Sequence, residues 1–178
     1  YLNAFNFFDG INLQAGLHSI LIFIIIIFKL NFEIEYFQLL IFYMFFLIYN
    51  WKNLVFLGNS GAYISAVIIS LILIFYSKQL TFSATEIFVI MSIPGLDMLR
   101  LVVVRSVKLN NPLKGDLNHI HHLARNKFGL IKSNFIIITS QIINYIIYYF
   151  FKNDFLSIFS SIVIYLLIFM LFNFRKKR

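Results

Sequence analysis

Residues 155–172 read FLSIFSSIVIYLLIFMLF, an apolar run that contains no charged residue. A helix rises about 1.5 Å per residue and needs about 20 apolar residues to cross a hydrocarbon core of about 30 Å, so this run can form a transmembrane helix. Similar runs recur along the chain, and the predicted spans are residues 13–28, 36–49, 62–76, 84–104, 135–151 and 155–172. The pattern predicts an all-α, polytopic integral membrane protein with about six transmembrane helices.

The composition supports a membrane protein and excludes several other classes. The 178-residue chain is 61% hydrophobic and 12% charged, whereas ordinary soluble domains are about 25% charged. Its formal net charge of +8 comes from basic residues placed between apolar runs, and these do not form the extended basic face of a nucleic-acid-binding protein. Without cysteine, disulfides and thiolate metal sites are excluded. We expect one membrane domain over residues 1–178, and the start at Tyr1 without a methionine indicates the C-terminal fragment of a longer protein.

The basic residues divide unequally between the two sides of the predicted bundle. One side receives Lys29, Lys78 and Lys152. The other side receives the rest, namely Lys52, Arg100, Arg105, Lys108, Lys114, Arg125, Lys127, Lys132, Arg175, Lys176, Lys177 and Arg178. Loops rich in Lys and Arg remain in the cytoplasm. The sequence therefore predicts a multi-pass protein of the cytoplasmic (inner) membrane, with its polar motifs together on the cytoplasmic face.

The first polar motif lies at the start of the chain. Asn3, Asn6 and Asp9 recur at every third position, which places them on one face of a helical turn. Such a face can hold a metal ion, a phosphate-bound cation or a sugar hydroxyl. The alternative is a polar helix end followed by an Asp9-Gly10 turn.

The second motif is the segment Gly58-Asn59-Ser60-Gly61 before the third predicted span. Its glycines allow a ligand to approach the backbone, and the helix that follows offers free N–H groups to an anion. The alternative is an ordinary turn in which Ser60 caps the helix.

The third motif interrupts an otherwise apolar segment with Pro94, Gly95, Asp97 and Arg100. Pro94 and Gly95 are expected to break or kink the helix. Ionisable residues at membrane depth are candidates for function, and the alternative for Asp97 and Arg100 is a structural ion pair.

The fourth motif is the histidine run, His119-Ile120-His121-His122, in a basic segment. Neutral imidazoles bind metals, and protonated imidazoles donate hydrogen bonds to a diphosphate. Zinc would require further ligands, and only Asp116 lies nearby, so phosphate recognition fits better. The alternative is a solvated basic loop close to anionic lipid headgroups.

In this order the four motifs resemble those of the polyprenyl-phosphate N-acetylhexosamine-1-phosphate transferases of glycosyltransferase family 4. Residues 3–10 resemble the family's asparagine-aspartate-glycine motif, and residues 58–62 resemble its glycine-aspartate-x-glycine-serine motif. Residues 93–100 and 116–122 resemble the segment that ends in the family's His-x-His-His, a form typical of the GlcNAc branch. The resemblance covers the C-terminal half of such an enzyme.

The resemblance implies transfer of a HexNAc 1-phosphate, of GlcNAc type, from a UDP-sugar to undecaprenyl or another polyprenyl phosphate, with release of UMP. This is a first membrane step in the synthesis of cell-envelope polysaccharides such as lipopolysaccharide O-antigen. The implied cofactor is Mg²⁺ or Mn²⁺, the apolar spans hold the prenyl tail among membrane lipid, and the family often works as a homodimer. The implied catalytic residues are Asp9, Asn6, His119, His121 and His122; Asn3, Ser60, Asp97, Arg100, Arg105 and Asn118 bind substrate, and Asp9 and Asn59 bind metal.

Two departures from the family pattern leave alternatives open. Asn59 replaces the family's metal-associated aspartate, and Ala62 replaces its serine. The chain also contains no adjacent Asp-Asp pair, so these residues alone are predicted not to catalyse the reaction. The alternatives are a non-catalytic homologue that binds lipid phosphate and a small transporter subunit whose path is lined by Asp97 and Arg100.

Overall fold

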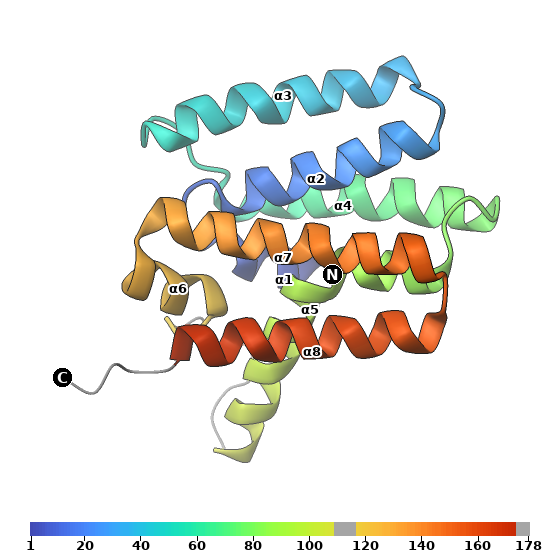
Figure 1. The fold of residues 1–178 in the computed structure, drawn as a ribbon. Helices are drawn as coiled ribbons and strands as arrows, with labels where there is room; N and C mark the ends of the chain where they lie inside the picture. Colours follow the sequence, from blue (N-terminus) through green and yellow to red (C-terminus); the bar gives the residue numbers. More distant parts are fainter. Residues whose placement is uncertain (109–116, 174–178) are drawn as a thin grey trace.

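A computed structural model describes residues 1–108 and 117–173. In these two ranges the chain forms eight helices and no strand (Figure 1). The helices are α1 (Leu2–Phe8), α2 (Gln14–Lys29), α3 (Ile34–Trp51), α4 (Gly58–Lys78), α5 (Ala84–Val107), α6 (Ile120–Phe128), α7 (Leu130–Phe151) and α8 (Asp154–Asn173). The predicted all-α class is confirmed.

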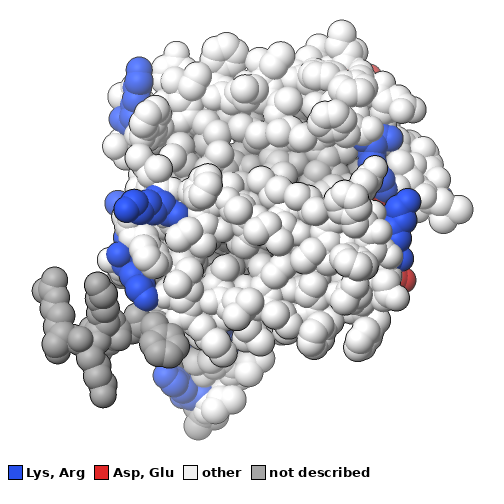
Figure 2. All heavy atoms as spheres, in the orientation of Figure 1, with Lys and Arg blue, Asp and Glu red and all other residues white. Residues whose placement is uncertain are grey.

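Five of the helices, α3, α4, α5, α7 and α8, are long and apolar enough to cross a membrane. The remaining predicted span, residues 13–28, corresponds to α2, which is apolar but has only 16 residues. Figure 2 shows a broad band without charged side chains between two edges that carry Lys and Arg. Many large apolar side chains are exposed on the long helices, among them Phe42, Ile64 and Phe159. These features define a polytopic membrane protein.

The two ends of the bundle differ in charge. At the end where α2, α4 and α7 begin, the described basic residues are Lys52, Arg100, Arg105, Lys108, Arg125, Lys127 and Lys132. The opposite end holds Lys29, Lys78 and Lys152, and the ammonium group of Lys29 pairs with the buried carboxylate of Glu86. Tyr145 donates a further hydrogen bond of 2.9 Å to Glu86. Lys114 and residues 175–178, which also entered the prediction of sidedness, lie outside the described residues.

Two hydrophobic clusters hold the helices together. The larger one is centred on α2 and α4, with Phe23, Ile26 and Ile69 among its buried members. The smaller one joins α1 and α6 to α5, α7 and α8 through residues such as Phe8 and Ile120. The short helices α1 and α6, in segments that the hydropathy pattern leaves between spans, are thus anchored in the core.

The polar residues inside the spans are paired with one another. Asn144 on α7 donates hydrogen bonds to Ser92 at 3.0 Å and to Ser161 at 2.8 Å, which links α5, α7 and α8. Pro94 lies inside α5 without ending it, so the predicted break does not occur. The C-terminal part of α5 extends past α8 and away from α7 in Figure 1.

Candidate functional site

The first and fourth motifs meet where α1 ends and α6 begins. A Cβ atom built on Gly10 would lie only 2.1 Å from Nε2 of His121 and 2.9 Å from Nε2 of His122, so the histidine run sits directly against the glycine backbone. Phe8 contacts His121 edge to face, with 6.0 Å between the ring centroids. The ring of Phe7 stacks on His119 at 5.3 Å. Asp9 and the histidines therefore belong to one site.

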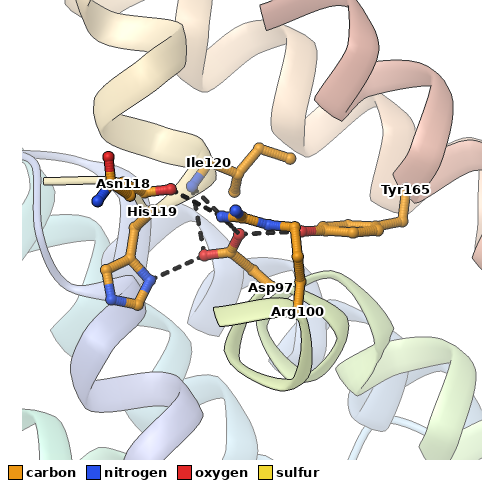
Figure 3. A network of polar contacts seen from close by, with 6 residues as sticks. All are labelled: Asp97, Arg100, Asn118, His119, Ile120 and Tyr165. Carbon is orange, nitrogen blue, oxygen red and sulfur yellow. Dashed lines mark hydrogen bonds and ion pairs between the residues drawn. The ribbon is translucent and has the colours of Figure 1, made fainter. Parts of the chain in front are cut away.

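Asp97 on α5 fixes the start of α6 (Figure 3). Its Oδ2 lies 2.9 Å from Nδ1 of His119, and the backbone N–H of Ile120 donates to both carboxylate oxygens at 3.2 and 3.3 Å. Its Oδ1 also accepts hydrogen bonds from Arg100 at 2.8 Å and from Tyr165 at 3.0 Å. A carboxylate at a helix N-terminus satisfies a free N–H group and complements the helix dipole. Three segments far apart in sequence thus hold His119 in place.

The orientation of His119 leaves one ring nitrogen for another partner. Because Nδ1 donates to Asp97, Nε2 is the ring nitrogen that remains for another partner. Nε2 of His119 and both ring nitrogens of His121 are buried and have no hydrogen-bond partner within the described part of the chain. Buried polar atoms are rarely left unpaired, so these nitrogens mark a place for a ligand.

A polar cleft of about 350 Å³ opens beside these histidines. Its lining is mostly amide and backbone groups, with one carboxylate and one guanidinium; the residues are Asn6, Asp9, Gly10, Ile11, Asn12, Asn50, Phe56, Leu57, Gly58, Asn59 and Arg125. Partial burial raises the pKa of Asp9 to about 7. Near neutral pH this carboxyl can therefore exchange a proton for a cation.

The histidine at the centre of the run is neutral at physiological pH. Burial, together with the neighbouring His122, lowers the pKa of His121 to about 3. A neutral imidazole carries one N–H donor and one lone pair. His121 is therefore a neutral imidazole and not a protonated one.

Asn50, which belongs to none of the four motifs, connects two walls of the cleft. Its side-chain oxygen accepts a hydrogen bond of 2.6 Å from the N–H of Leu13, whose φ of 72° is left-handed. Its amide nitrogen donates to the carbonyl of Val55 at 2.8 Å. In the sequence, Asn50 is marked only by its position, as an amide at the end of an apolar run. Asn50 thus joins the segment after Asp9 to the loop before Asn59.

We expect Asn50→Ala to lower the free energy of unfolding by about 2 kcal/mol, because it removes two partly buried hydrogen bonds that join separate segments of the chain. Thermal unfolding in detergent, followed by circular dichroism, measures the loss. Asn126→Ala on the exposed side of α6 is the matched control and should change stability by less than about 0.5 kcal/mol. Equal stability of the two variants would contradict this role for Asn50.

The remaining predicted site residues lie around the cleft or apart from it. Asn3 accepts a hydrogen bond of 3.2 Å from Tyr63. Ser60 is exposed in the first turn of α4 and does not cap it, because the N-cap residue is Leu57; the capping alternative is therefore wrong. Arg100, Arg105 and Asn118 line a different pocket. Asp116 lies outside the described residues.

The cleft can accommodate a hard divalent cation together with phosphate. No group of three His, Cys, Asp or Glu side chains that could hold a metal occurs among residues 1–108 and 117–173. However, Mg²⁺ is commonly bound by one or two carboxylates, with water and substrate phosphates completing the octahedron. Asp9, with the amide oxygens of Asn6 and Asn59 in the same cleft, fits this pattern.

The fold and the cleft together define a multi-pass membrane protein with a polar site at one end of its helices. Residues 1–77 match the model of a family described as Glycosyl transferase family 4. The family resemblance is thereby confirmed for this segment, which contains the first two motifs, and it supports a membrane sugar-phosphate transferase kind of function. The match ends before Asp97 and the histidine run, so their assignment to family motifs stays a prediction. No curated protein and no solved structure matches the chain.

Proposed function

We propose that the protein transfers a HexNAc 1-phosphate, of GlcNAc type, from a UDP-sugar to polyprenyl phosphate at the cytoplasmic face of the inner membrane. The observation that carries the proposal is the contact of Gly10 with His121: Gly10 lines the cleft next to Asp9, and the histidine run lies against its backbone. The product would be a lipid-linked sugar that feeds cell-envelope polysaccharide synthesis, and a homodimer is the expected assembly.

An apolar groove next to the cleft suits the prenyl chain. It has a volume of about 450 Å³ and lies between α3 and α4; it is lined by Leu39, Phe42, Tyr43, Phe46, Val55, Phe56, Leu57, Gly61, Ile64, Ser65 and Ile68. Phe56 and Leu57 line both the groove and the cleft. A lipid phosphate could therefore reach Asp9 while its tail remains in the apolar groove.

The reaction joins two anionic substrates, so the site must offset their repulsion. An oxygen of the lipid phosphate attacks the β-phosphorus of the UDP-sugar, and the bond from that phosphorus to the bridging oxygen breaks, so that UMP leaves with the bond electrons. Arg125 lines the cleft and supplies a fixed positive charge. His121 offers one N–H donor to a phosphate oxygen, while Asp97 holds the Nδ1 side of His119 and leaves Nε2 for another partner.

Asp9 is the group that would hold a divalent cation, with Asn6 and Asn59 supplying amide oxygens. Mg²⁺ bound there would neutralise the charge of the transferring phosphates. An amide binds the ion more weakly than a carboxylate, so Asn59→Asp should tighten cation binding.

The raised pKa of Asp9 predicts pH-dependent cation binding. Since burial raises this pKa to about 7, the carboxyl is protonated below pH 7 and must lose its proton to bind Mg²⁺. We expect the apparent Mg²⁺ affinity to rise by about tenfold per pH unit below pH 7 and to level off above it. Titration with Mg²⁺ between pH 5.5 and 8.5, monitored by isothermal calorimetry, measures how the apparent affinity changes with pH. Asp9→Asn should abolish this pH dependence, and an unchanged pH dependence in that variant would contradict Asp9 as the ligand.

Binding of UDP-GlcNAc to the purified chain tests the proposed donor site. In detergent with Mg²⁺, we expect calorimetry to show saturable binding that Arg125→Gln weakens by about tenfold, through loss of a charge-assisted contact. Lys132→Gln is the matched control, because Lys132 is an exposed basic residue near the same end that does not line the cleft. Absence of binding, or equal loss in both variants, would contradict the donor site.

A further inference from the structure

His18 is a buried histidine that belongs to none of the four motifs and does not line the cleft. It lies in the second turn of α2. Its Nδ1 is 3.0 Å from Oε1 of Gln141 on α7, and its Nε2 is 3.0 Å from the hydroxyl of Tyr1, the N-cap residue of α1. One imidazole therefore connects three helices.

The two hydrogen bonds define the protonation of this imidazole. A carboxamide oxygen only accepts, so Nδ1 of His18 carries the ring proton and donates to Gln141. Nε2 is then the acceptor, and the hydroxyl of Tyr1 donates to it. An apolar side chain of similar size could fill the same space but could make neither bond. The imidazole is therefore suited to a specific connection and not only to packing.

The helix that His18 holds is the one that leads to Asp9. α1 has seven residues and no side-chain cap, and a helix this short is not stable without tertiary contacts. The N–H of Phe5 donates to the carbonyl of Tyr1 at 2.8 Å, so the bond between Tyr1 and His18 ties down the first turn. Asn6 and Asp9 follow within this short segment. The placement of the first turn therefore affects which way both side chains face.

A second set of contacts leads from His18 to the histidine run. The ring of His18 meets Phe8 edge to face, with 5.4 Å between the ring centroids, and Phe8 meets His121 in the same way at 6.0 Å. Phe5, one turn earlier on α1, lies 5.9 Å from the ring of His18. Edge-to-face contacts prefer a defined ring orientation. A rotation of α1 would therefore move the ring that supports His121.

We propose that His18 is a positioning residue for the transferase site and that it acts through α1. Its hydrogen bond to Tyr1 fixes the rotation of α1 about its own axis, so that Asp9 lies in the cleft while Phe8 supports His121. Reacting groups require such support from side chains that do not themselves contact the substrate. The effect of His18 on turnover rests on the proposed function, whereas its effect on the ring of His121 does not.

Two amide variants separate the two bonds of His18. The side chain in His18→Gln reaches about as far as Nε2, so its oxygen can still accept from Tyr1, and the bond to Gln141 is lost. The side chain in His18→Asn reaches only as far as Nδ1, so the bond to Tyr1 is lost instead. We expect His18→Asn to shift the nitrogen NMR signals of the His121 ring and to lower UMP release at saturating substrates by about tenfold. His18→Gln should leave both measurements close to those of the wild type.

Two further variants complete the experiment. Tyr1→Phe removes the donor of the same bond and should reproduce the effects of His18→Asn. Asn144→Ala is the matched control, because Asn144 is a buried amide on α7, one turn after Gln141, whose hydrogen bonds lead to α5 and α8 and not to α1. It should lower stability but leave the His121 signals unchanged. UMP release is measured in membranes that contain the protein as its gene encodes it, and NMR is recorded on that protein in detergent.

Three outcomes would overturn the proposal. Unchanged His121 signals in both His18→Asn and Tyr1→Phe would show that the bond does not position the site. An equal effect of His18→Gln and His18→Asn would show that the contact with Tyr1 is not the one that matters. An equal shift of the His121 signals in Asn144→Ala would assign the effect to a general loss of stability. Absence of UMP release from the wild type would contradict the proposed function instead, and the His121 signals would still decide the role of His18.

Discussion

Asp97→Ala is expected to lower the free energy of unfolding by about 3–5 kcal/mol, because it removes one partner of a buried ion pair. The carboxylate is only 2% exposed and bonds to Arg100, His119, Tyr165 and the N–H of Ile120. Its loss leaves the partly buried guanidinium of Arg100 without its carboxylate partner and the first N–H of α6 without its acceptor. Thermal unfolding in detergent, followed by circular dichroism, measures the effect.

Two further variants separate the ion pair from its neighbours. Tyr165→Phe removes the hydrogen bond of 3.0 Å to Asp97 and the one of 2.7 Å that Arg100 donates to the Tyr165 hydroxyl, and it should cost about 1–2 kcal/mol. Asp97→Asn keeps the shape of the side chain but loses its charge, so its loss of stability should lie between those of Asp97→Ala and Tyr165→Phe. Nitrogen NMR of the histidine rings should show that His119 loses its fixed Nδ1–H tautomer in Asp97→Ala. Wild-type stability together with an unchanged tautomer would contradict the positioning role of Asp97.

Gly10→Ala is expected to reduce transferase activity by about 100-fold, the size of effect that a displacement of about 1 Å at a reacting group produces. The added Cβ would lie 2.1 Å from Nε2 of His121, so the imidazole must move away from Gly10. The strain should also lower stability by about 1–3 kcal/mol. Release of UMP from UDP-GlcNAc and undecaprenyl phosphate, in membranes that contain the protein as its gene encodes it, measures the activity.

Gly95→Ala is the matched control for this substitution. A Cβ on Gly95 meets no atom within 4 Å, and the residue lies inside α5, where alanine is the better helix former. It should keep full activity and equal or slightly higher stability. Full activity of Gly10→Ala would mean that contact between the first motif and the histidine run is not needed for the reaction.

The spans could be predicted from sequence because apolar length is a local property. The runs around residues 36–49, 62–76 and 155–172 all lie within observed helices. The short helices α1 and α6 were not predicted as buried elements, since neither is long enough to give a hydropathy signal. Their apolar residues, such as Phe8 and Ile120, become significant only when the folded core is seen.

The site could be predicted only in part, because its connections cross large distances in sequence. The motifs correctly pointed to one end of the bundle, where Gly10 and His121 now lie in contact. No spacing rule connects Asp97 with Tyr165, or Leu13 with Asn50, because each pair joins different helices or loops. The neutral state of His121 likewise follows from burial in the folded protein.

The central claim is that the site transfers a sugar together with its phosphate. The most direct measurement uses UDP-GlcNAc labelled with ³²P at the β-phosphate, incubated with undecaprenyl phosphate and membranes containing the protein as its gene encodes it. We predict that the label enters the organic, lipid-soluble fraction in step with UMP release, and that Asp9→Ala abolishes both. Label that remains in UDP while sugar reaches the lipid would contradict the account, as would the absence of any transfer.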